Sequence, residues 1–105
     1  MSLVVIFRAR AGEFDPEHMP TALRLRDTAL AEFGCEEFVF ATTPDGEEVA
    51  LSYWPDEASI KRWRAHAEHL DAQREGRARW YSSYRVQVAE IRRDYGHSAA
   101  GPISR

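Results

Sequence analysis

The chain has 105 residues, a mass of 12.0 kDa and a formal net charge of −3 at pH 7, with 44% hydrophobic and 30% charged residues. These values indicate a single globular domain and argue against a strongly basic, nucleic-acid-binding surface. No apolar run approaches the ~20 residues that span a bilayer, and the one cysteine, Cys35, excludes an internal disulfide. Because the start of the chain lacks a signal-peptide pattern, we expect a cytoplasmic protein with no membrane or nucleic-acid partner.

The first half of the chain has the pattern of a strand, a helix and a hairpin. Residues 3–9 form a run rich in β-branched and aromatic residues that is largely apolar on both faces, which predicts a strand that is buried on both sides. The segment 15–17, with Asp15 as N-cap followed by Pro and Glu, predicts a helix start, and Gly34 predicts its end. Residues 35–43 and 48–54 are expected to pair as a hairpin around a Pro-Asp-Gly turn.

The second half predicts one more helix and one more strand. Asp56 is expected to cap the helix, whose apolar stripe consists of Ile60, Trp63, Ala67 and Leu70. Residues 84–91 are expected to form the last strand, with a bulge at 89–90 because the apolar alternation slips there. Ser, Ala, Gly and Pro dominate residues 96–105, which predicts a flexible C-terminal tail.

The element order βαββαβ within the domain at residues 1–95 favours an α+β fold of the ferredoxin-like type. In that fold the sheet is antiparallel and both helices lie on one of its faces. The first strand, however, is apolar on both faces, so the face without helices also needs a cover. The same face of a second copy is the simplest cover, and we therefore expect a homodimer through the open sheet face.

The motifs of the second half carry a family resemblance. The third strand ends in Trp54, the second helix carries W-x-x-H-x-x-H-x-x-x-Q from Trp63 to Gln73, and a Gly-Arg pair precedes W-Y-x-x-Y at residues 80–84. Together they resemble the antibiotic biosynthesis monooxygenase superfamily, in the branch grouped with haem-degrading monooxygenases. The resemblance implies a dimeric α+β barrel and an oxygenase reaction, which in one part of the superfamily needs no cofactor and acts on hydroxyaromatics.

Two positions depart from the pattern of the haem-degrading members. Trp63 matches their helix tryptophan, but Gln73 stands where the resemblance places the axial histidine. Phe7 or Arg8 stands where it places an asparagine on the first strand. Since glutamine is a poor haem ligand compared with histidine, the resemblance favours chemistry without a tightly bound cofactor, and haem binding or degradation is the alternative.

The polar residues of the second helix form one edge beside its apolar stripe. At ~100° per residue, His66, His69 and Gln73 fall on the same flank, as expected for the polar rim of a pocket. Imidazoles exchange protons near neutral pH, which makes His66 a candidate general base. The alternative is a histidine that only packs against its neighbours. No third ligand accompanies His66 and His69, so no metal site is predicted. His18 and His97 are expected to be solvated.

The aromatic residues are divided between a core and a pocket. Trp54 and Tyr84 are expected to fill the core. A flat apolar slot for a planar ligand is expected to be lined by the others, namely Trp63, Trp80 and Tyr81, with Phe7 and Phe40 closing it from the sheet.

The combined prediction is a monooxygenase that holds a small hydroxyaromatic and lets it react with oxygen. The candidate catalytic groups, which would generate or stabilise the phenolate, are His66, Gln73 and Tyr81. The candidate substrate-binding residues are Trp63, Trp80, His69, Phe7 and Phe40. A non-catalytic, ligand-binding dimer of the same fold is the further alternative, because a fold does not determine a function.

Overall fold

The computed structural model describes residues 2–12, 14–74, 80–99 and 101–103, and for 68–74 and 101–103 it describes the backbone alone. The main elements follow one another in the predicted order, as β1 (Leu3–Ala11), α1 (His18–Glu32), β2 (Glu37–Thr42), β3 (Glu48–Trp54), α2 (Glu57–Arg74) and β4 (Tyr81–Glu90). Within these described ranges, neither helix is long and apolar enough to cross a membrane.

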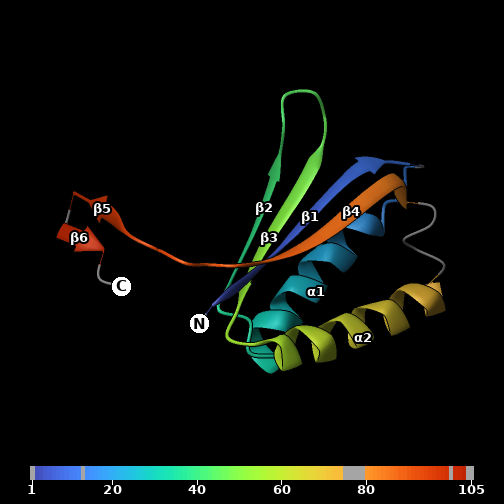
Figure 1. The fold of residues 1–105 in the computed structure, drawn as a ribbon. Coiled ribbons are helices and arrows are strands. Elements are labelled where there is room, and N and C mark those ends of the chain that lie inside the picture. The colour runs from blue at the N-terminus through green and yellow to red at the C-terminus, as the bar shows by residue number, and fades with distance from the viewer. Residues whose placement is uncertain (1, 13, 75–79, 100, 104–105) are drawn as a thin grey trace.

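The four strands of this body form one antiparallel sheet in the order β2-β3-β1-β4. β1 is central, because it pairs with β3 on one side and with β4 on the other. Both helices lie on the same side of the sheet (Figure 1). The predicted α+β, ferredoxin-like architecture is therefore confirmed.

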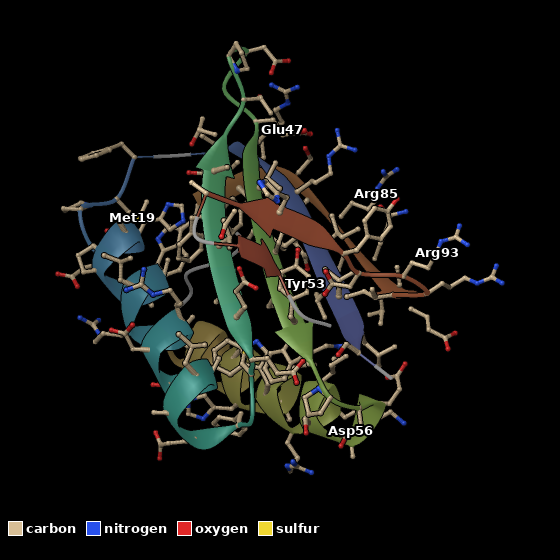
Figure 2. The ribbon with its side chains drawn as sticks, turned by 90° about the vertical axis from the view of Figure 1, so that its left-hand side faces the viewer. Met19, Glu47, Tyr53, Asp56, Arg85 and Arg93 are labelled. Atoms are coloured by element: carbon tan, nitrogen blue, oxygen red, sulfur yellow. The ribbon has the colours of Figure 1, made fainter. Side chains whose placement is uncertain are left out.

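The central strand divides its side chains between the two faces of the sheet. Val5 and Phe7 lie on the helix side, where they line a cavity. Ile6, which alternates with them, pairs with Leu51 of β3 and lies on the opposite, open face. Figure 2 shows this open face, with Tyr53 on it. The strand thus carries apolar side chains on both faces, as its sequence indicated.

The core closes one end of the space between the sheet and the helices. Trp54 has no exposed surface, and its Nε1 donates a hydrogen bond to Oγ of Ser52 at 2.8 Å. Around this tryptophan pack the buried residues Ala29, Cys35 and Ile60. β1 starts here, with Leu3 opposite Trp54, and ends opposite Tyr81 of β4. The core and Tyr81 therefore lie at opposite ends of the sheet.

Two helix boundaries follow the local signals of the sequence. Asp56 Oδ1 accepts a hydrogen bond from the backbone N–H of Ser59 at 2.8 Å, which confirms it as the cap of α2. The hydrogen bonds from Ser59 also hold the pKa of the Asp56 carboxyl below its usual value. Gly34, which follows α1, has a φ of +80°, a conformation that favours glycine at a helix end.

The start of α1 differs from the prediction. The helix begins at His18, and Glu17 occupies the N-cap position without a side-chain capping bond, so the prediction of Asp15 as N-cap was wrong. Asp15 instead closes a turn before the helix, where its Oδ1 accepts a hydrogen bond from the N–H of Glu17 at 2.9 Å. Its other oxygen is held by Trp80, a contact that local sequence does not reveal.

The last strand of the sheet begins earlier than expected and contains no bulge at residues 89–90. β4 starts at Tyr81, and its register with β1 is regular from Glu90 back to Ser83. The shift lies at the other end, between Arg10 and Ala11 of β1. The apparent slip in alternation before Ile91 arises because β4 ends at Glu90.

The C-terminal segment contains a small hairpin. β5 (Gly96–Ser98) and β6 (Gly101–Ile103) pair as antiparallel strands. The hairpin stands away from the body, on the side of the sheet opposite the helices (Figure 1). The composition of residues 96–105 predicted a flexible tail, and its flexibility stays a prediction.

Candidate active site

A cavity of about 160 Å³ lies between the sheet and the two helices. The sheet contributes Val5, Phe7, Phe38, Phe40, Ala50, Ser52, Tyr81, Val86 and Val88 to its lining, and the helices contribute Ala22, Leu25, Ile60, Trp63, Arg64 and Ala67. Trp80, directly before β4, completes the described lining. An apolar cavity of ~150 Å³ accommodates benzene in another protein, so this cavity has room for about one aromatic ring.

The structure brings the predicted slot residues together. All five of them line this one cavity, namely Trp63, Trp80, Tyr81, Phe7 and Phe40. Three of them come from the strands β1, β2 and β4, one comes from α2, and Trp80 directly precedes β4. The slot is therefore a product of tertiary packing. Their role in binding a substrate stays a prediction.

A polar cluster stands where β4 begins, at the end of the sheet remote from Trp54. The hydroxyl oxygen of Tyr81 lies 2.9 Å from Nε2 of His18. The His18 ring stacks on Trp80, with ring centroids 4.8 Å apart and planes inclined by 13°. Nε1 of Trp80 donates a hydrogen bond to Oδ2 of Asp15 at 2.8 Å. His18 is half-buried, so the prediction that it is solvated was wrong.

The register shift in β1 explains how Tyr81 comes to face the cavity. Ala9 pairs with Tyr84 and Ala11 pairs with Tyr81, so two tyrosines that are three positions apart point to the same side. Both tyrosine rings contact Phe7, at centroid distances of 5.3 and 5.7 Å. A regular strand would have turned one of the two tyrosines to the open face.

The predicted histidine of α2 has a different environment. The His66 ring packs against Phe33 at 5.1 Å and Trp63 at 5.9 Å, and His66 is not among the described lining residues. The side chains of His69 and Gln73 lie outside the described part of the chain. The catalytic role proposed for this edge of the helix therefore stays a prediction.

The cavity is open along the outer edge of the sheet. Val86 and Val88 of β4 line the cavity and are nevertheless 42% and 41% exposed. Tyr84 on the same strand is 50% exposed, so its assignment to the core was wrong, whereas that of Trp54 is confirmed. β4 is an edge strand, so the side chain of Tyr84 is only partly covered by its neighbours.

The lining is almost entirely apolar, with few groups for chemistry. Arg64 carries the only charge among the described lining residues. Ser52 accepts the hydrogen bond of Trp54, which leaves the hydroxyl of Tyr81 as the acid–base group in this part of the lining. Among the residues whose side chains are described, no group of three His, Cys, Asp or Glu could hold a metal ion.

A haem does not fit the described residues of this cavity. Haem iron is held by the side chain of a histidine, cysteine, methionine or tyrosine. The described lining holds no histidine, cysteine or methionine, and the Tyr81 hydroxyl is engaged with His18. The volume of about 160 Å³ is also that of one ring, far below a porphyrin.

Comparison with solved structures defines the class of this fold. A variant of SnoaB, a cofactor-independent oxygenase from Streptomyces nogalater, matches with a TM-score of 0.71 and 17% identity, over 89% of this chain and 95% of that chain. A variant of MhuD with two manganese protoporphyrin IX molecules per active site matches with a TM-score of 0.61 and 14% identity, over 90% of this chain and 98% of that chain. A solved antibiotic biosynthesis monooxygenase matches with a TM-score of 0.58 and 18% identity, over 85% of this chain and 97% of that chain. This chain shares its fold with these proteins, as the resemblance of its sequence motifs implied.

Sequence comparison identifies a nearer relative. No protein-family model matches the chain. YqjZ of Bacillus subtilis (strain 168), an uncharacterised protein, is 36% identical over 89 residues, which cover 85% of this chain and 78% of YqjZ. The chain belongs to the same family as YqjZ.

Proposed function

We propose that the protein is a cofactor-independent monooxygenase that oxidises a small hydroxyaromatic with molecular oxygen. The observation that supports the proposal is the apolar cavity of about 160 Å³ with Tyr81 in its lining, a residue whose hydroxyl oxygen lies 2.9 Å from Nε2 of His18. The shared fold with SnoaB, a cofactor-independent oxygenase, points to the same chemistry.

The proposed reaction needs no electrons from outside the substrate. Loss of the hydroxyl proton makes the ring a strong electron donor, so the phenolate reduces oxygen and then bonds to it as a ring hydroperoxide. Loss of water from the hydroperoxide leaves a quinone. For a phenol with a free para position, the ring gives up two hydrogens, one oxygen atom enters the ring, and the other leaves as water.

In this reaction the protein binds, orients and desolvates the substrate. Trp63 and Phe7 supply flat apolar surfaces for the ring. The apolar lining keeps water away from the phenolate and the hydroperoxide. Arg64 supplies a positive charge near the developing anion, and Tyr81 hydrogen-bonds its oxygen. We propose that His66 acts through the position of Trp63, with which its ring is in contact.

The active form in this proposal is a homodimer. The open face carries Ile6, Leu51 and Tyr53 in its centre, and Val39 of β2 on the same face is 40% exposed. Figure 2 shows this face free of helices. A second copy that presents the same face would bury these side chains and complete an α+β barrel.

Oxygen consumption tests the proposed function. The purified protein is mixed with one-ring phenols, two-ring naphthols and three-ring anthrones, each with a free ring position that can take up oxygen, in an oxygen electrode without added metal or flavin. We expect uptake with the one-ring compounds and a decline with ring number, because the cavity has room for about one ring. No uptake with any of these compounds would refute the proposal.

A matched pair of variants links the activity to the cavity. Ala22 of α1 lines the cavity, whereas Ala31 of the same helix is exposed outside it. Ala22→Phe should fill the space of the substrate and lower kcat/KM about tenfold or more, and Ala31→Phe should leave it within about twofold. Equal activity of the two variants would place the reaction elsewhere.

Two further measurements separate the alternatives. Haem binding is the second candidate, because the fold is shared with MhuD, solved with a metalloporphyrin, although the described cavity lining supplies no free haem ligand. A titration at micromolar haem should show no Soret shift, and a saturable shift would favour that candidate. Binding of hydroxyaromatics without oxygen uptake would identify a non-catalytic, ligand-binding protein.

A further inference from the structure

We propose that Tyr81 and His18 form a proton-relay pair, in which Tyr81 takes the hydroxyl proton of the bound substrate and passes its own proton to His18. This inference rests on the proposed function, because it needs a hydroxyaromatic in the cavity. It assigns the acid–base chemistry to the start of β4 and the start of α1, whereas the sequence analysis placed it on α2.

Tyr81 forms part of the cavity wall, and His18 lies behind it, away from the cavity. Tyr81 lines the cavity, and its hydroxyl oxygen is 2.9 Å from Nε2 of His18. His18 is not among the described lining residues and is half-buried. Tyr81 is therefore the group that would touch the substrate. His18 is a positioning residue that acts through Tyr81.

Packing fixes the geometry of the pair. The His18 ring lies on Trp80 at 4.8 Å with nearly parallel planes. Trp80 in turn is held by its hydrogen bond to Asp15. The Tyr81 ring sits with its edge against Phe7, at 5.3 Å and 65°. Each ring of the pair thus has an aromatic neighbour that restricts its rotation, so the 2.9 Å contact is pre-formed.

Each bond that breaks in the proton transfer is matched by one that forms. The substrate O–H bond breaks as a new O–H bond forms on Tyr81, and the original O–H bond of Tyr81 breaks as an N–H bond forms on Nε2 of His18. The products are a phenolate and an imidazolium, which requires that neutral His18 carries its hydrogen on Nδ1. The proton returns along the same route when the ring peroxide takes it up to form the hydroperoxide. The later loss of water takes its second hydrogen from the ring carbon, so the pair ends unchanged.

The protonation state of a bound one-ring phenol tests the relay without turnover. 4-Nitrophenol is a suitable probe, because its phenol and phenolate forms absorb at different wavelengths. The full-length protein is titrated with it at a pH about one unit below the ionisation of the free probe. We expect the wild-type protein to bind mainly the phenolate.

Four variants assign the effect to the pair. Tyr81→Phe removes the hydroxyl, and His18→Phe keeps a ring on Trp80 but removes the nitrogen. His18→Gln keeps a hydrogen-bonding partner for Tyr81 but does not take up a proton. All three should bind the probe within about threefold of the wild-type affinity, but as the neutral phenol. Tyr84→Phe, on the same strand and outside the described lining, should behave as wild type.

The outcomes distinguish failure of the relay from failure of the proposed function. If His18→Gln binds the phenolate as well as the wild type does, His18 only packs and the inference is overturned. Binding of the neutral phenol by every protein, wild type included, overturns it too, while the cavity remains a hydroxyaromatic site. If the folded wild-type protein does not bind the probe, the relay and the proposed substrate class both fail.

Discussion

Nε2 of His18 lies 2.9 Å from the hydroxyl oxygen of Tyr81, although the two residues are 63 positions apart. His18 is the first residue of α1, and Tyr81 is the first residue of β4. They meet because β4 begins beside the end of β1, from which a short connection leads into α1. The polar end of the cavity is therefore assembled from both halves of the chain.

The contact between His66 and Trp63 predicts a positional role for this histidine. His66→Ala should remove one of the aromatic neighbours of Trp63 and lower oxygen uptake about five- to tenfold, because small misplacements of substrate-holding groups reduce the rate. His66→Phe keeps an aromatic ring against Phe33 and Trp63 and should restore uptake to within about twofold. Equal inactivity of the two variants would show that the imidazole itself takes part in the chemistry.

The core at the start of α2 predicts a large cost for Ile60→Ala. Ile60 is 3% exposed and packs with Trp54 and Ala29. Its truncation leaves a cavity and should lower the free energy of unfolding by about 2–5 kcal/mol, measured by urea denaturation at a fixed protein concentration. Leu30→Ala on α1 is the control, because Leu30 is 41% exposed and should cost less than about 1 kcal/mol. Similar costs for both variants would contradict this location of the core.

The open sheet face predicts the oligomeric state. Sedimentation should give the wild-type protein twice the chain mass of 12.0 kDa at micromolar concentration. Leu51→Arg places a charge in the centre of the open face, opposite Ile6, and should shift the protein to monomers. Leu23→Arg, on an exposed position of α1, should remain dimeric. A monomeric wild-type protein would exclude the barrel-like dimer.

The turn between β2 and β3 predicts a pH dependence of stability. Hydrogen bonds from Thr43 and Arg10 lower the pKa of Asp45 from 3.8 to about 2. Because the folded protein favours the ionised carboxylate, its contribution is present above about pH 4 and disappears as the pH falls through about 2. Asp45→Asn should therefore lower the thermal midpoint slightly near neutral pH, and the difference should shrink as the pH falls from about 4 towards 2. The effect should be small because the pair is exposed, and a difference that stays constant over this range would contradict its assignment to ionisation.

Local signals accounted for much of the fold. β3 occupies the predicted residues 48–54, Asp56 caps α2, and Gly34 ends α1 with positive φ. Each of these features depends on side chains and backbone within a few positions of one another, so short sequence patterns carry the information. The prediction of Asp15 as a cap failed because residues 16–17 form a turn and the helix starts only at His18.

The aromatic slot was predictable in its members but not in its chemistry. Phe7, Trp63 and Trp80 line the cavity as expected, since large aromatic residues near helix and strand ends tend to face a common interior. His18 was missed because it stands alone at the start of a helix, with no partner at helical spacing. Its partner Tyr81 faces the cavity through a register shift between Arg10 and Ala11 that the sequence did not indicate.

The amino-acid sequence by itself determined the order of strands and helices, the apolar character of both sheet faces and the ferredoxin-like fold class. These properties follow from periodicity and local motifs. Only the tertiary structure decided which residues meet in the cavity, that His18 stands behind Tyr81, and that the outer edge at β4 stays open. Those features depend on strand register and on contacts between distant segments, and both arise only when the sheet is assembled.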